Sequence, residues 1–462
     1  MGIGTFIDDA APAERALRTA PVARLARASA ARVDAERRLS PELAAEITAA
    51  GFPAHFVPRR WGGSAGTFRQ LVDAVAAVGE ECVATAWCAA LYAAHGRLAA
   101  YLPERGQREL WGASPDVRIA AAVVPPAGRA VPEGEGWRIW GEWHYASGVD
   151  HADWVLVAVR LEGAGGGPHG HGPGGGTHAA AGGAGGGAHG DEPDGGAHGA
   201  DRGVPEVRCF AVPCRELVIK DSWHSLGLRG TGSNTVVAAG VLVPRHRSFT
   251  LAELDNVREG ADRCHAVPHR LVAPLQFAAP VLGAARGAWR HAFAAERAGR
   301  PGVRAAVTPE VLARADGEIE AALLLLGAAA DRADAGDAGP DAVTRNQRDA
   351  ALAAELCTTA VDRLFRAGGT RAHLDGDPLQ RAWRDLSTGA SHATLAFGTA
   401  AAAFMAEKAA AFEAGGGATP GGDTGTAPTF DAAPAPAPGA GAVGTSAVAP
   451  RAATPLTTGD AR

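Results

Sequence analysis

The stretch Trp140-Gly-Glu-Trp-His-Tyr-Ala-Ser-Gly-Val-Asp-His-Ala-Asp-Trp154 is the most informative part of the chain. Large apolar residues alternate in it with polar or small ones, which predicts a half-buried strand, and a second apolar run follows. Ser147-Gly148 separates the two runs, so the first strand ends in a polar corner. A hydroxyl, a glycine that lets a ligand approach, and the flanking His144 and His151 suit the edge of a planar cofactor. These residues alone favour an ordinary hairpin bend.

Two further stretches follow this corner along the chain: Asp221-Ser-Trp-His-Ser-Leu-Gly-Leu-Arg-Gly-Thr-Gly-Ser-Asn234 and Leu364-Phe-Arg-Ala-Gly-Gly369. With Ser147-Gly-Val-Asp-His-Ala152 they resemble, in the same order, motifs of the acyl-CoA dehydrogenase superfamily. The resemblance is to its branch of two-component flavin-dependent monooxygenases, which includes hydroxylases of phenols and aromatic polyketides. It covers most of residues 15–412, and several separated motifs in one order are more specific than any one of them.

Composition limits the classes of function. The chain has 462 residues, of which 47% are hydrophobic and 20% charged, enough for two or three globular domains. A net charge of -6 gives no basic surface for nucleic acid. The six cysteines form no Cys-x-x-Cys pair, so we expect free buried thiols and no metal site. Without a signal sequence or an apolar run of membrane length, we expect a cytoplasmic protein.

The pattern of residues predicts an α+β fold with three parts. Residues 1–116 read as an N-terminal helical domain, 117–250 as a middle β domain (barrel or sandwich), and 264–412 as a C-terminal four-helix bundle. A Gly- and His-rich insertion at 162–205 and a tail at 413–462 have too few apolar residues to order, so we expect both to be disordered.

More detailed boundaries follow from turn residues and helix formers. The predicted strands are 117–124, 137–146, 153–161, 206–212, 216–223 and 234–243. The predicted bundle helices are Ala273–Ala298, Pro309–Ala333, Ala342–Ala367 and Pro378–Ala411. The loop Phe56-Val-Pro-Arg-Arg-Trp-Gly-Gly63 joins two helices of the first part and matches a superfamily junction.

Several residues are candidates for binding the flavin that the resemblance implies. Three glycines and several hydroxyls between Leu226 and Asn234 free backbone N–H groups to face a polar ligand. The resemblance also places the glycines after Leu364 near the cofactor tail of a neighbouring subunit in a homotetramer, although a simple helix end explains them equally. The candidate cofactor contacts are Trp143, Ser147, Gly148, Arg229, Thr231, Ser233, Gly368 and Gly369.

The carboxylate base of acyl-CoA dehydrogenases is absent. In that family a glutamate usually follows an Arg-Asp pair by eight residues, and here Ala393 stands at that distance from Asp385. An alternative position, at the start of the first bundle helix, falls on His269. Neither residue can abstract a proton as a carboxylate does.

Histidines are the candidate catalytic residues instead. The resemblance implies that His392 lies over the flavin and that Ser147 hydrogen-bonds the flavin near N5. It also implies that Trp87, His95 and His269 face the substrate, with His95 catalytic. A serine or threonine that assists this histidine in relatives is missing from the strand after Pro115, which leaves the substrate open.

The resemblance therefore predicts the oxygenase component of a two-component monooxygenase. Reduced FMN or FAD, supplied by a separate NAD(P)H:flavin reductase, would react with O2 to a C4a-hydroperoxide and hydroxylate an aromatic or phenolic substrate. Two alternatives remain: an acyl-CoA dehydrogenase with an unrecognised base, and a flavin-binding paralogue without catalytic activity.

Overall fold

The computed structural model describes residues 16–161, 206–256, 258, 260–298 and 307–414. The insertion predicted at 162–205 and all but the first two residues of the tail predicted at 413–462 lie outside the described residues. Within the described ranges, no helix is long and apolar enough to cross a membrane. No group of three or more His, Cys, Asp or Glu side chains in those ranges is placed to hold a metal ion.

The N-terminal part consists of helices whose ends follow capping residues in the sequence. They are α1 (Thr19–Glu36), α2 (Pro41–Ala49), α3 (Phe68–Gly79), α4 (Val83–Ala99) and α5 (Glu104–Trp111). The Ser40 hydroxyl accepts the Leu43 N–H at the start of α2, and Thr67 with Gln70 forms a capping box at the start of α3. All seventeen residues of α4 are buried, so this helix lies inside the molecule.

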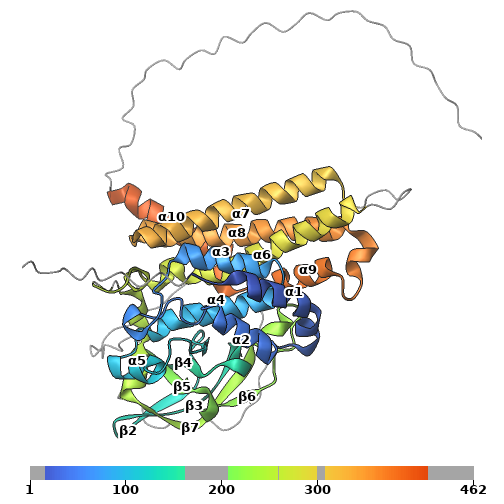
Figure 1. Ribbon diagram of the computed structural model, residues 1–462. Coiled ribbons are helices and arrows are strands. Elements are labelled where there is room, and N and C mark those ends of the chain that lie inside the picture. The colour runs from blue at the N-terminus through green and yellow to red at the C-terminus, as the bar shows by residue number, and fades with distance from the viewer. Residues whose placement is uncertain (1–15, 162–205, 257, 259, 299–306, 415–462) are drawn as a thin grey trace, which may run out of the picture. The chain divides into compact units, whose positions relative to one another are not determined.

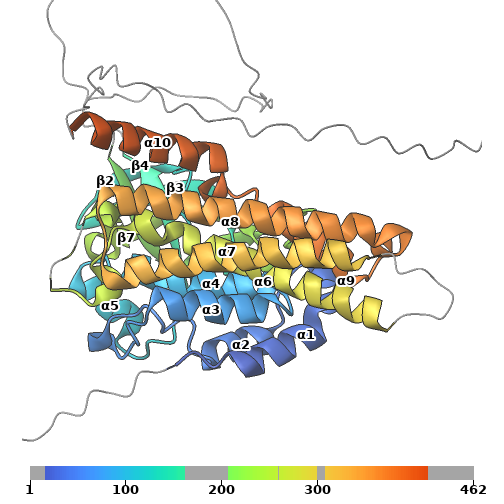
Figure 2. The same cartoon turned by 90° about the horizontal axis from the view of Figure 1, so that it is seen from above.

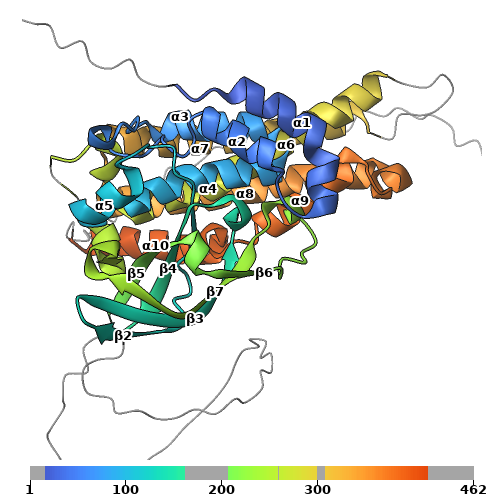
Figure 3. The ribbon, with the colours of Figure 1, turned by 60° about the horizontal axis from the view of Figure 1, so that its bottom comes forward.

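The middle part is a sandwich of two four-stranded sheets (Figures 1 and 3). One sheet has the order β1 (Ile119–Ala122), β4 (Trp154–Arg160), β5 (Val207–Pro213), β8 (Ser248–Thr250). The other has the order β2 (Arg129–Glu133), β3 (Gly136–Ala146), β7 (Asn234–Pro244), β6 (Val218–Lys220). Of these pairings β1 with β4 is parallel and the rest are antiparallel.

The β1–β4–β5–β8 sheet is covered on both faces. Its inner face packs against the other sheet through Val157 and Phe210, which share a core with Ile139 and Trp143. Its outer face packs against the end of α4 and against α5, through Ile119, Leu156 and Phe249 among others. The helices therefore hold one sheet directly and the second sheet through the first.

The C-terminal part is a bundle of long helices that run side by side with α3 (Figure 2). It contains α6 (His269–Arg297), α7 (Pro309–Ala335), α8 (Pro340–Ala367) and α9 (Pro378–Gly389). Glycines allow α3 and α6 to approach closely, because a Cβ on Gly79 would lie 3.1 Å from the Cα of Gly283.

The single helix predicted over Pro378–Ala411 is wrong. The chain leaves α9 at Gly389, forms a 3-10 turn over Ala393–Leu395, and starts α10 (Phe397–Ala414) in a new segment. The His392 side chain caps the turn by accepting the Thr394 N–H. Because Ala400 is the one buried residue of α10, that helix adds little to the core.

The contact between the β domain and the bundle gives a test of the fold. A Cβ on Gly227 would lie 1.9 Å from the carbonyl oxygen of Arg384 in α9. We expect Gly227→Ala to lower the free energy of unfolding by about 1–3 kcal/mol, as overpacking of a buried contact does. Unfolding in urea, followed by tryptophan fluorescence, measures the change.

Gly317→Ala is the matched control. Gly317 lies in the middle of α7 and a Cβ there would meet nothing within 4 Å. Because alanine favours the helix, the free energy of unfolding of this variant should be about 0.5–1 kcal/mol higher than that of wild type. If Gly227→Ala were as stable as Gly317→Ala, the close packing of the loop on α9 would be disproved.

Candidate active site

The corner at the end of β3 is held in an unusual backbone conformation. Tyr145 has φ of 67°, which is uncommon for a residue other than glycine, and Gly148 has φ of 70°. The buried Tyr92 of α4 donates a hydrogen bond from its hydroxyl to the Gly148 carbonyl at 2.6 Å. A Cβ on Gly148 would lie 2.7 Å from that hydroxyl oxygen. The corner therefore needs glycine at this position, and α4 fixes where Ser147 sits.

A chain of buried hydroxyls starts at this corner. The Ser147 and Ser233 hydroxyl oxygens are 2.7 Å apart, and those of Ser233 and Thr231 are 2.6 Å apart. Thr231 donates its proton to the Leu228 carbonyl at 2.8 Å. It follows that Ser233 donates to Thr231 and Ser147 donates to Ser233. The indole N–H of Trp87 donates to Ser147 at 3.3 Å, so Ser147 keeps one lone pair for a further donor.

His392 reaches this cluster from the bundle. Its ring stacks on Phe277 of α6, with centroids 3.8 Å apart, and meets Trp87 edge-on at 6.1 Å. Its Nδ1 accepts the backbone N–H of Thr394 at 3.3 Å, so the neutral ring carries its proton on Nε2. Burial lowers the pKa of His392 to about 4, which keeps the ring neutral at pH 7.

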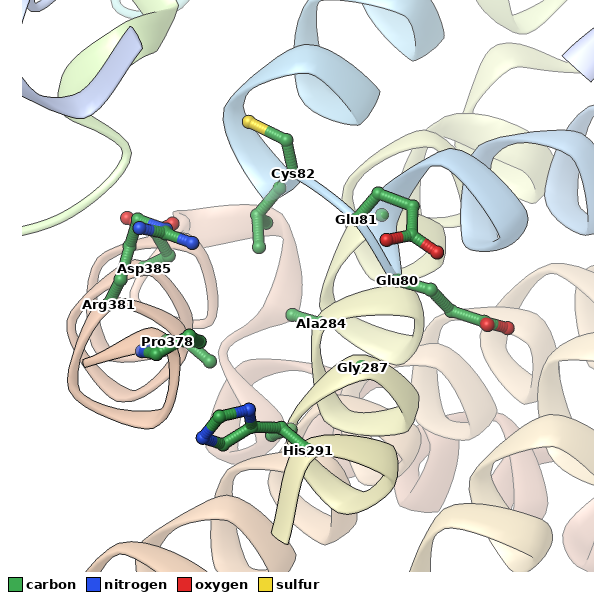
Figure 4. A pocket seen from close by; sticks show the side chains of 13 residues that line it. Glu80, Glu81, Cys82, Ala284, Gly287, His291, Pro378, Arg381 and Asp385 are labelled. Carbon is green, nitrogen blue, oxygen red and sulfur yellow. The ribbon is translucent and has the colours of Figure 1, made fainter. Parts of the chain in front are cut away.

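The loop of β-domain residues 222–234 is anchored to α9. The backbone N–H of Leu228 donates to Asp385 Oδ1 at 2.6 Å, and that of Gly227 donates to the Thr388 hydroxyl at 3.0 Å. Burial is the largest cause that raises the pKa of Asp385, to about 7. Figure 4 shows Asp385 beside Arg381 on α9, at a pocket that α9 shares with α6 and the turn before α4.

Two aromatic residues beside this cluster, Tyr145 and Trp223, were not among the site residues predicted from the sequence. The Tyr145 side chain is 65% exposed, and its ring meets that of Trp223 edge-on, with centroids 6.0 Å apart. The Trp223 indole N–H donates to the Leu228 carbonyl, which also accepts from Thr231. One signal for Tyr145 was its position two residues before Ser147.

The two histidines predicted to face the substrate form a second group. His95 lies farther along α4, and His269 is the first residue of α6. His95 lies eight residues from Trp87, or about 12 Å along the helix. Its Nδ1 donates to the Ile119 carbonyl at 2.8 Å, which leaves Nε2 as an acceptor, and burial lowers its pKa to about 4. At the start of α6, burial, Arg97 and His95 lower the pKa of His269 to about 3.

The remaining predicted contacts are not brought to this cluster. Trp143 is 1% exposed, packs inside the sandwich and donates its indole N–H to the Ala158 carbonyl at 2.8 Å. No face of its ring is open to a ligand, so a direct cofactor contact by Trp143 is wrong. Arg229 opens a 3-10 turn in the anchored loop and is half-buried. Gly368 and Gly369 lie at the end of α8, and their predicted contact with a neighbouring subunit stays a prediction.

Comparisons with known proteins agree with this architecture. The family model for the acyl-CoA dehydrogenase C-terminal domain matches residues 275–397. The chain is 29% identical to the flavin-dependent monooxygenase oxygenase subunit HsaA of Mycobacterium tuberculosis, over 77% of this chain and 85% of that protein. It is 28% identical to the oxygenase component of an FADH(2)-dependent resorcinol hydroxylase from Rhizobium sp., over 82% of this chain and 90% of that protein.

Solved structures give the same result for the fold. The crystal structure of 3-HSA hydroxylase from Rhodococcus sp. RHA1 has a TM-score of 0.72 at 25% identity, over 86% of this chain and 97% of that one. Helices that cover one face of a β sandwich and continue into a helical bundle define an acyl-CoA dehydrogenase-like fold. Residues 275–397 match the acyl-CoA dehydrogenase C-terminal domain, and over most of its length the chain is similar to oxygenase components of flavin-dependent monooxygenases.

The buried Asp385 makes stability depend on pH. In the unfolded chain its carboxyl ionises near the ordinary pKa of 3.8, whereas in the folded protein its pKa is about 7. Between these values the folded state holds a proton that the unfolded state has lost, so stability falls as pH rises and the loss is complete above about pH 7.

Asp385→Asn should remove this loss, because asparagine cannot ionise and its side-chain oxygen can still accept the Leu228 N–H. We expect the difference in free energy of unfolding between the variant and wild type to grow, in favour of the variant, by about 2–4 kcal/mol as the pH is raised from 4 to 8. Urea unfolding at several pH values measures the difference. A constant difference across that range would contradict the assignment.

Proposed function

We propose that the protein is the oxygenase component of a two-component monooxygenase that uses reduced flavin and O2 to hydroxylate an aromatic or phenolic substrate. The relatives named above, an oxygenase subunit and an oxygenase component, support the reaction class. The observation that carries the proposal is the hydroxyl chain that leaves Ser147 as an acceptor, beside a neutral bundle histidine. When bound, the reduced flavin supplies the electrons that activate O2.

The residues at the corner fit a reduced flavin. Reduced flavin carries an N–H at N5, and the unused lone pair of Ser147 is an acceptor for such a donor. A flat ring system also needs an apolar surface, which the exposed Tyr145 and the half-buried Trp223 provide. Thr231 is 1% exposed and so acts through Ser233 rather than by direct contact.

The positions that carry the glutamate base in dehydrogenases hold Ala393 and His269 here. The nearby carboxylates have structural hydrogen bonds: Asp385 accepts the Leu228 N–H, and Asp150 accepts the Asn234 side-chain N–H at 3.2 Å. Proton abstraction next to a thioester carbonyl, the reaction of the alternative dehydrogenase, therefore lacks its usual carboxylate at both of those positions.

The two buried histidines present opposite hydrogen-bonding groups. His95 offers Nε2 as an acceptor, because its Nδ1–H is held by the Ile119 carbonyl. We propose that this nitrogen accepts a hydrogen bond from the phenolic O–H of the substrate. That hydrogen bond makes the aromatic ring of the substrate more nucleophilic. His392 offers an Nε2–H, because its Nδ1 is held by the Thr394 N–H. We assign it to donate to the oxygen that is transferred or released.

The remaining features of the proposal follow from the relatives. Reduced FAD is the first flavin to test, because one relative is FADH(2)-dependent, with reduced FMN as the second. A separate reductase supplies it, since both relatives are described as single components or subunits of an oxygenase. We also propose a homotetramer in the cytoplasm, in which Gly368 and Gly369 contact a neighbour's flavin.

Rapid mixing tests the function directly. The protein, loaded without oxygen with reduced FAD or reduced FMN, is mixed with oxygenated buffer while flavin absorbance is recorded. We expect a slow, multiphasic return to oxidised flavin, because a flavin held at Ser147 against aromatic side chains is shielded from water. Reoxidation of the flavin in one phase, at the rate of free flavin, would contradict the oxygenase function. It would favour the alternative of a flavin-binding paralogue without catalytic activity. Reduction of oxidised flavin by an acyl-CoA would support the dehydrogenase.

Histidine variants test the two assigned roles. With a phenol that the protein hydroxylates, His95→Ala should leave the flavin phases nearly unchanged but lower the product formed per flavin by about 10²-fold or more. His392→Ala should alter the flavin phases themselves, because that residue contacts Trp87, which donates a hydrogen bond to Ser147. Stopped-flow absorbance and product analysis separate the two effects.

His291→Ala is the control for loss of a histidine, since this residue lies on α6 with its side chain 37% exposed. It should behave as wild type. Undiminished product from either His95→Ala or His392→Ala would show that the assignment of that residue is wrong.

A further inference from the structure

A second pocket lies at the far end of α4, away from the hydroxyl cluster. It is formed by the turn that ends at Trp61, the residue that follows α4 and the segment that leads into α6, and its lining includes Arg59, Arg60, Ala100, Arg258, Asp262 and His265. Ala100 follows Trp87 by thirteen residues, or about 20 Å along the helix, so this pocket is separate from the corner at Ser147.

His265 is the most unusual residue of this pocket. Its side chain is 2% exposed, yet neither ring nitrogen makes a hydrogen bond of ordinary geometry, although the backbone of Phe56 lies close to the ring. Buried polar atoms without partners are rare, because leaving one unsatisfied is unfavourable. Burial and the charges of Arg97, Arg258 and Arg60 keep the ring neutral, so it holds one N–H donor.

The arginines of the pocket are only partly neutralised. Arg59 pairs with Asp262, whose carboxylate accepts its backbone N–H at 3.2 Å and lies 3.7 Å from its Nε. Arg60 donates to the neutral side chain of Gln107 at 2.7 Å. Arg258 donates to the Ala100 carbonyl at 3.0 Å. Within the described ranges, no carboxylate pairs with Arg60 or Arg258, so the pocket is electropositive.

A buried cation lies behind the pocket and adds to this potential. The Arg97 side chain is 2% exposed, and its guanidinium donates to the backbone carbonyls of Cys264 and Val267, on either side of His265. Among the residues that the structure describes, it pairs with no carboxylate either. Neutral carbonyl partners satisfy its hydrogen bonds without cancelling its charge.

We propose that this pocket binds the carboxylate or phosphate group of a small molecule. Arg60 and Arg258 supply charged donors that suit an oxyanion, and His265 supplies a neutral donor inside the pocket. Such a ligand would give the His265 ring the partner that it lacks. The site does not depend on the flavin chemistry proposed above.

The pocket also explains the loop Phe56–Gly63, to which the flavin site gives no role. Gly62 has φ of 82°, and a Cβ on Gly63 would lie 2.1 Å from the Val57 carbonyl oxygen. The two glycines therefore permit a turn that no other residues would form without strain. That turn places Arg59 and Arg60 at the rim of the pocket.

Calorimetric titration of the full chain with sulfate, and separately with acetate, tests the site. Sulfate stands for a phosphate group and acetate for a carboxylate. Saturable binding of either ion supports the proposal, and the stronger of the two identifies the class of ligand. Absence of saturable binding by both would overturn it.

Variants distinguish this pocket from adventitious binding. Arg60→Gln and Arg258→Gln should each weaken binding by about tenfold or more, because each removes a charged hydrogen bond. Arg314→Gln is the matched control, since Arg314 is an exposed arginine on α7 that pairs with Glu310. It should bind as wild type does. Equal affinity in all three variants would mean that the anion binds elsewhere and would disprove the site.

Discussion

The burial of α4 on every side is the constraint on which the site depends. The large polar side chains of a helix that is enclosed all round need partners within the protein, because water does not reach them. Trp87 and Tyr92 donate hydrogen bonds to the corner of β3. His95 donates to the first strand of the sandwich, and Arg97 donates to the segment before α6. The same hydrogen bonds that satisfy α4 therefore fix the β domain and the bundle around it.

How far the sequence determines the elements can be argued from particular helices and strands. Strands with alternating apolar residues were predicted to within a few residues, as β3 and β7 show. The short β2 was missed, because it is mostly exposed and contains Pro132. The break after α9 was missed because helix-forming residues stand on both sides of it. In the structure the break is marked by a local cap, in which the His392 side chain accepts the Thr394 N–H.

The candidate site shows a similar division. Ser147, Thr231 and Ser233 share one chain of hydroxyls, and His392 approaches it through Trp87, but their predicted contacts with flavin stay predictions. The prediction for Trp143 failed because strand alternation gives two faces without saying which is inside. Trp143 lies on the same inner face of the sandwich as Ile139, and a register shift of β3 against β7 just after Trp143 precedes the exposed Tyr145. A positive φ of this kind is a property of the packed corner and has no sequence pattern outside glycine.

The two buried histidines are both neutral and differ in the hydrogen-bonding role that the fold gives to each. Burial lowers the pKa of both His95 and His392 to about 4, so neither ring titrates near neutral pH in the free protein. Their difference comes entirely from the backbone group that each Nδ1 meets, which is a carbonyl in one case and an N–H in the other. One ring is thereby fixed as an acceptor and the other as a donor. In this site, acid–base asymmetry is set by two backbone hydrogen bonds rather than by two different pKa values.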